Sequence, residues 1–272
     1  MIRNLCILFL IFSSQSASFA ADSESIQSLN GQNSEGVETE ASFWQQRKAE
    51  AFSPWQTEAR PYLIYGSLVT AAILATKHNG EDQFNENMAK DQPLGDAAEI
   101  GDLGGQGFTN LFYIAGMGGH YYFTKSQKSY DHMTTMLLAT AYAVGTSSIL
   151  KFIVHEPRPN DRTTYNSFPS GHTTSAFAFS SVIIAEHGFW PWGFAATALA
   201  TLTGISRVND HKHYLHDVTA GFTIGSAYGF GISYLRQGQQ LNKHAAGGAS
   251  SHFYVMPVFA KERGGLVAYY EY

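Results

Sequence analysis

The segment SRVNDHKHYLHD, residues 206–217, holds three histidines, two aspartates and one arginine between two apolar segments. So many titratable groups beside apolar helices are costly to place, and such density is typical of sites where chemistry requires it. His213 and Asp217 are four residues apart, so in a helix the carboxylate can hold one ring nitrogen. The other nitrogen is then left as a nucleophile or base. The pattern also fits a polar helix N-terminus whose side chains satisfy backbone donors.

Composition limits the class of protein. The chain has 272 residues, of which 44% are hydrophobic and 14% charged, which fits one domain or one domain with a short appendage. Its formal net charge is -5 and it has no block rich in Lys and Arg. We therefore expect no nucleic-acid partner.

The N-terminus has the three parts of a secretory signal peptide. A basic start, MIRN, precedes the apolar segment LCILFLIF and then small residues up to Ala20. The apolar part is too short to span a bilayer, so we predict a signal peptide over residues 1–20. The single cysteine, Cys6, would leave with it. Export without disulfides suits a bacterial cell envelope, either periplasmic or membrane-associated, with the active site facing the periplasm.

Residues 21–59 are predicted to form a disordered leader and a surface helix. The leader is rich in Ser, Glu, Gln, Asn and Gly and has too few apolar residues to fold. Residues 43–52 mix aromatic and charged side chains, as a short helix docked on a larger domain would.

The fold class that we predict is all-α, a six-helix bundle over residues 60–236. Six apolar segments rich in small residues have lengths that favour helix over strand: 62–76, 108–123, 133–154, 173–185, 192–205 and 218–235. The mean hydropathy of -0.16 is low for six full membrane spans. Residues 237–272 are predicted to be a linker and a C-terminal β-hairpin around Gly264-Gly265.

The third and fourth segments carry further polar groups. The third segment runs into Lys151 and then Pro157-Arg158-Pro159, where the prolines end the helix and hold Arg158 on a stiff turn. The fourth begins with PSGH, residues 169–172, in which Ser170 or Thr173 can cap the helix. A helix N-terminus with exposed N–H groups is suited to bind an anion. Taken singly, each motif also fits an ordinary helix stop or start.

These groups are predicted to meet at one end of the bundle. Antiparallel helices with short connections bring the end of the third helix, the start of the fourth, the end of the fifth and the start of the sixth to the same side. Three cations, a helix N-terminus and two histidines then converge. This combination favours a phosphate-like oxyanion.

The three motifs resemble the signature of the type 2 phosphatidic acid phosphatase and vanadium haloperoxidase superfamily. That signature is Lys, six residues, Arg-Pro; then Pro-Ser-Gly-His; then Ser-Arg, five residues, His, three residues, Asp. Lys151 to Arg158, residues 169–172 and residues 206–217 match each spacing in the same order. The linker between Pro159 and Pro169 is short, which leaves less room for a substrate-binding loop there.

The resemblance implies a role for each matched residue. His213 is the expected nucleophile, Asp217 orients it, and His172 is the acid that protonates the leaving oxygen. The implied phosphate ligands are Lys151, Arg158, Ser170, the Gly171 N–H and Arg207. Such cations can stabilise phosphoryl transfer without a metal, so we expect no cofactor. We also expect His213 to work neutral and His172 protonated, with their pKa values moved apart.

The resemblance suggests a phosphorylated lipid as substrate and contact with a membrane, although soluble members take small phosphate esters. The sequence keeps other functions open: a vanadium-dependent haloperoxidase, a metal site formed by His211, His213, His216 and Asp217, or a non-catalytic bundle. A cleaved signal peptide and six full spans would place the site on the cytoplasmic side. Positive charges at the opposite end argue against that placement, so we favour a bundle that is exported whole or only partly embedded.

One acidic segment between the first two predicted helices is expected to lie on the pocket side. We predict that it is a solvated loop, which could shape access to the pocket. Its acidic residues are Glu81, Asp82, Glu86, Asp91, Asp96, Glu99 and Asp102.

Overall fold

The computed structural model describes residues 40–246, 252–260 and 263–271, and Trp44–Tyr272 form one compact unit. The predicted signal peptide, residues 1–20, and most of the predicted leader lie outside the described residues. The helices are α2 (Glu40–Ala51), α3 (Ser53–Gln56), α4 (Arg60–Ala75), α5 (Asp82–Asp91), α6 (Ala97–Gly105), α7 (Phe108–Thr124), α8 (Gln127–Val154), α9 (Gly171–His187), α10 (Phe194–Asn209) and α11 (Leu215–Ala246). Two short π-helical turns, η1 (Lys77–Glu81) and η2 (Phe189–Gly193), precede α5 and α10.

Each of the predicted apolar segments lies largely within one long helix, namely α4, α7, α8, α9, α10 or α11. The surface helix that we predicted over residues 43–52 corresponds to most of α2. The prediction of a loop for the acidic segment was wrong, because this segment forms η1, α5 and α6. In α5, Asp82 in the first turn and Lys90 in the last turn complement the helix dipole.

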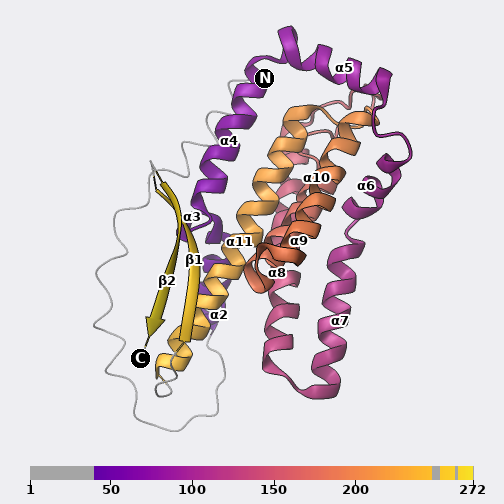
Figure 1. The fold of residues 1–272 in the computed structure, drawn as a ribbon. Coiled ribbons are helices and arrows are strands. Elements are labelled where there is room, and N and C mark those ends of the chain that lie inside the picture. The colour runs from indigo at the N-terminus through magenta and orange to yellow at the C-terminus, as the bar shows by residue number, and fades with distance from the viewer. Residues whose placement is uncertain (1–39, 247–251, 261–262, 272) are drawn as a thin grey trace. The chain divides into compact units, whose positions relative to one another are not determined.

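Small residues allow α11 to pack closely against α9. A Cβ atom on Gly221 would lie 2.7 Å from the carbonyl oxygen of Ser170, and one on Gly229 would lie 2.6 Å from the Cβ of Ser181. Gly225, between them, faces the backbone of α9 at similarly short range. These three glycines are four residues apart and form one face of α11. Figure 1 shows α11 beside α9, with α10 and α8 nearby.

The core between these helices is built from aliphatic and small side chains. Met136 and Ala139 of α8 pack with Val182 and Ile183 of α9 and with Ile232 of α11. All five are buried. This core fixes the relative positions of the helices that carry the sequence motifs.

The ends of these helices meet, as we predicted from antiparallel helices with short connections. The Ser170 N–H at the start of α9 donates to the Asp217 carbonyl oxygen in the first turn of α11, at 3.0 Å. The His213 N–H donates to the Arg207 carbonyl oxygen at the end of α10, at 3.2 Å. Lys151, in the last turn of α8, reaches the carbonyl oxygen of Pro169 just before α9. The motifs therefore lie together at one end of the bundle.

Within the described residues, α8 is the one helix that is long and apolar enough to cross a membrane, by length and composition. Only 17% of its most apolar window is buried inside the protein. Ile149 and Phe152 of α8 are 61% and 86% exposed, and Phe112 of the neighbouring α7 is 72% exposed. These two helices thus present apolar side chains on their outer surfaces.

The C-terminal segment forms two antiparallel strands, β1 (His252–Ala260) and β2 (Arg263–Glu271). Gly264 pairs with Phe259 and Gly265 pairs with Val258, so both glycines lie within β2. Our expectation that the chain turns around Gly264-Gly265 was therefore wrong in position.

Candidate active site

His213 and Asp217 form a buried pair at the start of α11. The His213 Nδ1 lies 3.3 Å from the Asp217 Oδ2, and both side chains are at most 2% exposed. The same carboxylate oxygen accepts the Tyr214 N–H at 2.9 Å and the Ser167 hydroxyl at 2.6 Å. These backbone and side-chain donors fix the position of the Asp217 carboxylate, which in turn orients the imidazole. With Nδ1 protonated toward Asp217, the His213 Nε2 keeps its lone pair.

The protonation states of this pair suit a nucleophile. Burial lowers the pKa of His213, and Asp217 opposes this effect without overcoming it. The imidazole is therefore neutral near pH 7. Burial alone would raise the pKa of Asp217, but the His213 hydrogen bond and the charge of His216 outweigh it and lower that pKa. The carboxylate is therefore ionised.

Two of the predicted phosphate ligands are held by the linker between α8 and α9. The Lys151 Nζ donates to the carbonyl oxygens of Asn166, at 2.6 Å, and Pro169, at 2.5 Å. The Arg158 Nε donates to the Asn166 Oδ1 at 2.7 Å. Asn166 thus places both cations beside the N-terminus of α9, a role that local sequence signals did not reveal.

Of the two residues predicted to cap the N-terminus of α9, Ser170 is the one that does so. The Ser170 hydroxyl oxygen accepts the Thr173 N–H, so Ser170 is the cap and Gly171 is the first helical residue. Ser170 is fully buried. Besides Thr173, the first-turn residues Gly171 and His172 carry N–H groups that have no partners within the helix. These two groups are therefore available to an anion, and the partial positive charge of the helix end adds to the attraction.

Asp102 of α6 links two further predicted site residues. Its Oδ1 pairs with the Arg207 Nη1 and lies 3.4 Å from the His172 Nε2. Arg207 is 2% exposed and its Nη2 also lies 3.2 Å from the Asp210 Oδ2. The Asp102 carboxylate therefore contacts the groups expected to bind a phosphate oxygen. The sequence predicted that the segment with Asp102 lies on the pocket side, but it gave no specific partner for Asp102.

His172 is neutral in this arrangement. Burial and the charge of Arg207 lower the pKa of His172 to about 4, although Asp102 acts in the opposite direction. We expected the pKa values of His172 and His213 to move apart, but both are lowered. An acid role for His172 therefore requires a nearby negative charge that raises its pKa.

A second charged network lies behind the His213–Asp217 pair. The His216 Nδ1 contacts the Glu81 Oε1 at 2.7 Å, and the Nε2 contacts the Glu156 Oε2 at 2.9 Å and the Asp217 Oδ1 at 3.3 Å. Lys77 pairs with Glu156. In the sequence His216 is a candidate metal ligand, and no local pattern links it to Glu81, which is 135 positions earlier.

The metal site that we considered around residue 213 is not assembled. Within the described residues, the group of possible ligands nearest this point is Glu156, His216 and Asp217, and it includes neither His211 nor His213. Hydrogen bonds and ion pairs among its members already account for their close approach. The geometry therefore assigns His213 to its pair with Asp217.

Comparison with known proteins gives three findings. Residues 132–241 match the sequence profile of the PAP2 superfamily. A lipid A 1-phosphatase of Porphyromonas gingivalis is 34% identical over 115 residues, which are 42% of this chain and 26% of that protein. The chain thus spans about a quarter of the length of this relative. A crystal structure of a transmembrane PAP2 type phosphatidylglycerolphosphate phosphatase from Bacillus subtilis aligns with a TM-score of 0.46 and 22% identity, over 70% of this chain and 97% of that one.

The matched region contains every residue of the three motifs, from Lys151 to Asp217. The resemblance seen in the sequence is therefore confirmed over residues 132–241, which match the PAP2 superfamily.

Proposed function

We propose that this protein is a phosphatase that hydrolyses a phosphomonoester or diphosphate of an envelope lipid without a metal. The observation that carries the proposal is the buried His213–Asp217 pair, which lies beside the N-terminus of α9 and three cationic side chains. The similarity to a lipid A 1-phosphatase supports a phosphorylated lipid as the substrate class. Lys151, Arg158 and Arg207 would neutralise charge on the phosphoryl oxygens.

The proposed reaction has two steps. In the first, the His213 Nε2 attacks phosphorus, an N–P bond forms and the P–O bond to the leaving group breaks. His172 gives its proton to the leaving oxygen. In the second, a water oxygen attacks phosphorus and its proton passes to His172, while the N–P bond breaks and its electron pair returns to the His213 Nε2. Inorganic phosphate then leaves, and both imidazoles are restored. Two steps of this kind replace one more difficult hydrolysis.

Substrate binding would supply the nearby negative charge that His172 needs in order to be protonated. The phosphate group carries negative charge to a position beside Arg207 and His172, and this charge favours the imidazolium form. For the phosphate to bind there, it must displace the Asp102 carboxylate from its contacts with both residues. Asp102 would therefore act as a competitor of the substrate in the resting site.

Location at a membrane is part of the proposal. Exposed apolar residues on α7 and α8, including Phe112, Ile149 and Phe152, provide a surface that acyl chains could cover. α8 has the length and composition of a membrane-crossing helix. We propose that the protein is exported to the cell envelope and acts on lipid headgroups there, with its active site facing the periplasm.

The test is phosphate release by the purified chain, with a lipid phosphate, a lipid diphosphate and a small soluble phosphomonoester as substrates. We expect release from lipid substrates, resistance to a metal chelator and inhibition by vanadate. His213→Ala should reduce release by at least about 1,000-fold. His211→Asn is the matched control, because His211 has a φ of 55° that Asn tolerates and is not assigned to the site.

Acid-labile, alkali-stable labelling of the protein by a radioactive phosphoryl group would identify the phosphohistidine. Preference for the soluble ester would replace the lipid substrate with a small one. Loss of activity in chelator, or full activity of His213→Ala, would overturn the mechanism.

A further inference from the structure

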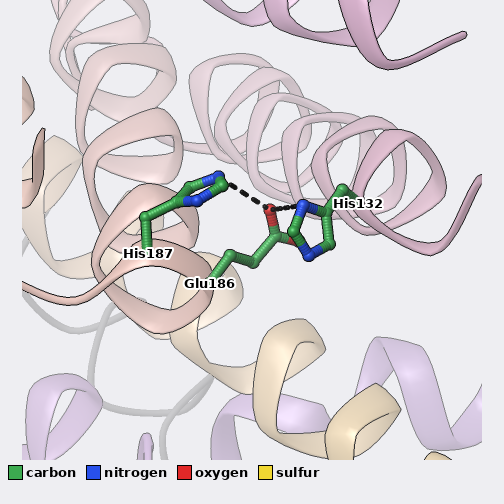
Figure 2. A group of neighbouring side chains, drawn as sticks. All are labelled: His132, Glu186 and His187. Carbon is green, nitrogen blue, oxygen red and sulfur yellow. Dashed lines mark ion pairs between the residues drawn. The ribbon is translucent and has the colours of Figure 1, made fainter. Parts of the chain in front are cut away.

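A second cluster of metal-binding residue types lies far from the His213 site. His132 is on α8, Glu186 and His187 are on α9, and Figure 2 shows the Glu186 carboxylate between the two imidazoles. His132 precedes Lys151 by 19 positions on the same helix, which corresponds to about 28 Å along the helix axis. The cluster therefore lies at the opposite end of α8 from the phosphate ligands.

The donor atoms of the cluster converge on one point. The Glu186 Oε2 lies 3.6 Å from the His132 Nδ1 and 3.9 Å from the His187 Nε2. The three donor atoms lie within 4.8 Å of one another. Bonds of roughly 2.0–2.2 Å to a tetrahedral Zn²⁺ place ligand atoms roughly 3.3–3.6 Å apart, so small side-chain movements would complete the geometry.

Tyr113 of α7 holds the carboxylate in this position. Its hydroxyl donates to the Glu186 Oε2 at 2.5 Å and lies 2.7 Å from the His187 Nε2. It also lies 3.4 Å from the His132 Nδ1. Metal-bound carboxylates commonly accept such a hydrogen bond from a residue outside the coordination sphere.

The charge on Glu186 is poorly compensated by the protein itself. Its side chain is 5% exposed. Within the described residues, its ion pairs are those with His132 and His187, and no Lys or Arg nitrogen pairs with it. A buried carboxylate is costly unless it is paired or bound to a metal, and imidazoles compensate it by charge only when they are protonated. A divalent cation would satisfy the carboxylate and both ring nitrogens together.

The cluster is open to a polar cavity of about 660 Å³, which His132 and Glu186 line. Arg236, which also lines it, is engaged by Asp131 and by the Thr134 hydroxyl, at 3.8 Å and 2.6 Å. Lys128 lines the same cavity, and its charge opposes the binding of a cation. The cavity provides an entry path, and replacement of Lys128 provides an independent test of where the cation binds.

We propose that His132, Glu186 and His187 bind a divalent transition metal, with Zn²⁺ as the best match to two imidazoles and one carboxylate. On metal binding, the Tyr113 hydroxyl moves away from the His187 Nε2 and keeps its hydrogen bond to Glu186, and the fourth coordination position faces the cavity. The metal would join α8 to α9 at this end of the bundle. This site goes beyond the proposed phosphatase reaction, because none of its ligands takes part in that reaction.

The experiment uses the full chain without a polyhistidine tag, stripped of metal by a chelator and then dialysed. Zn²⁺ binding is measured by calorimetry, and Co²⁺ serves as a probe whose visible absorption reports tetrahedral coordination. We expect one site of this kind and a rise in Tm when Zn²⁺ is added. His187→Ala and Glu186→Gln should weaken Zn²⁺ binding at least about tenfold, and Tyr113→Phe about tenfold or more.

Three further variants make the test specific. Lys128→Gln should tighten Zn²⁺ binding, because it removes a repelling charge. His120→Ala is the matched control, since His120 is on α7, contacts Ser129 and lies outside the cluster. It should bind Zn²⁺ as the wild type does. The proposal is overturned if the wild type binds no Zn²⁺, if His187→Ala and Glu186→Gln bind it normally, or if binding is lost only in His216→Asn.

His187 is 30% exposed on its side chain, so His187→Ala should fold normally. Its Tm without metal should equal that of the wild type, while the rise in Tm with Zn²⁺ disappears. Phosphate release is a separate readout. Zn²⁺ binding that persists in an inactive His213→Ala variant would support this site even if the proposed reaction proved wrong.

Discussion

Glu81 accepts a hydrogen bond from the Nδ1 of His216 at 2.7 Å, and both side chains are fully buried. Glu156 contacts the other ring nitrogen at 2.9 Å. Burial would lower the pKa of His216, but its hydrogen bonds with Glu156 and Glu81 outweigh this effect and raise the pKa to about 9. The imidazolium therefore holds η1 and the linker after α8 to the start of α11, next to Asp217.

This network predicts a loss of stability in alkaline solution. Because the pKa of His216 is higher in the folded protein than in the unfolded chain, its contribution is complete below about pH 6.5 and is lost as the pH rises through about 9. The free energy of unfolding should fall by up to about 3 kcal/mol across this range. Urea unfolding at a series of pH values measures this fall in the free energy of unfolding.

His216→Asn should remove most of this pH dependence, whereas His211→Asn should keep it. If His216→Asn does not fold, Glu156→Gln should shift the loss of stability to lower pH, because it removes a group that raises the pKa of His216. An unchanged slope in the folded variants would show that His216 is not the titrating group.

Asp102 is expected to compete with phosphate for Arg207 and His172. Asp102→Asn removes the negative charge that pairs with Arg207 and His172. Because a partly exposed ion pair contributes little free energy, we expect the inhibition constant for vanadate to fall only about two- to fivefold. Asp96→Asn is the control, because Asp96 precedes α6 and its side chain makes no capping hydrogen bond. Weaker vanadate binding in Asp102→Asn would mean that Asp102 helps to bind the anion.

The pH dependence of the reaction should reveal how the pKa of His172 changes when substrate binds. In the free protein the pKa of His172 is about 4, so the protonated fraction falls above that pH and kcat/KM should fall with it. Bound phosphate raises this pKa, so the alkaline limb of kcat should lie at higher pH than that of kcat/KM.

His172→Gln should remove the alkaline limb and reduce kcat by at least about 100-fold, as for the loss of a general acid. Both effects are measured from kcat and kcat/KM as functions of pH, with a phosphate ester of the preferred class as substrate. A flat wild-type profile between roughly pH 5 and 8, with chemistry rate-limiting, would contradict the assignment.

The close contact between α9 and α11 predicts opposite effects at two helical glycines. A Cβ on Gly225 would lie 2.9 Å from the Ala178 nitrogen and 3.0 Å from the Phe177 Cβ, so Gly225→Ala should destabilise the protein by about 1–3 kcal/mol. Gly145 of α8 has no atom within 4 Å of such a Cβ, so Gly145→Ala should stabilise by roughly 0.5–1 kcal/mol. Urea unfolding of both variants measures the difference. Equal effects would contradict the tight helix contact.

The sequence alone determined the helical class, the positions of the long helices and the order and spacing of the three motifs. Apolar segments of helical length, Pro157 and Pro159 after α8, and the Ser170 cap of α9 are local signals, because each acts within a few residues of the chain. The spacing of His213 and Asp217 predicted their pairing for the same reason: four residues is about one helical turn.

Only the tertiary structure decided which distant groups complete these motifs. Glu81 reaches His216, Asp102 reaches Arg207 and His172, and Tyr113 reaches Glu186 across helix contacts that no local pattern encodes. The acidic segment looked like a solvated loop because it is rich in acidic residues and holds a single lysine, Lys90. Two of its carboxylates, those of Glu81 and Asp102, pair with groups on other helices, and these pairs form only when the helices pack.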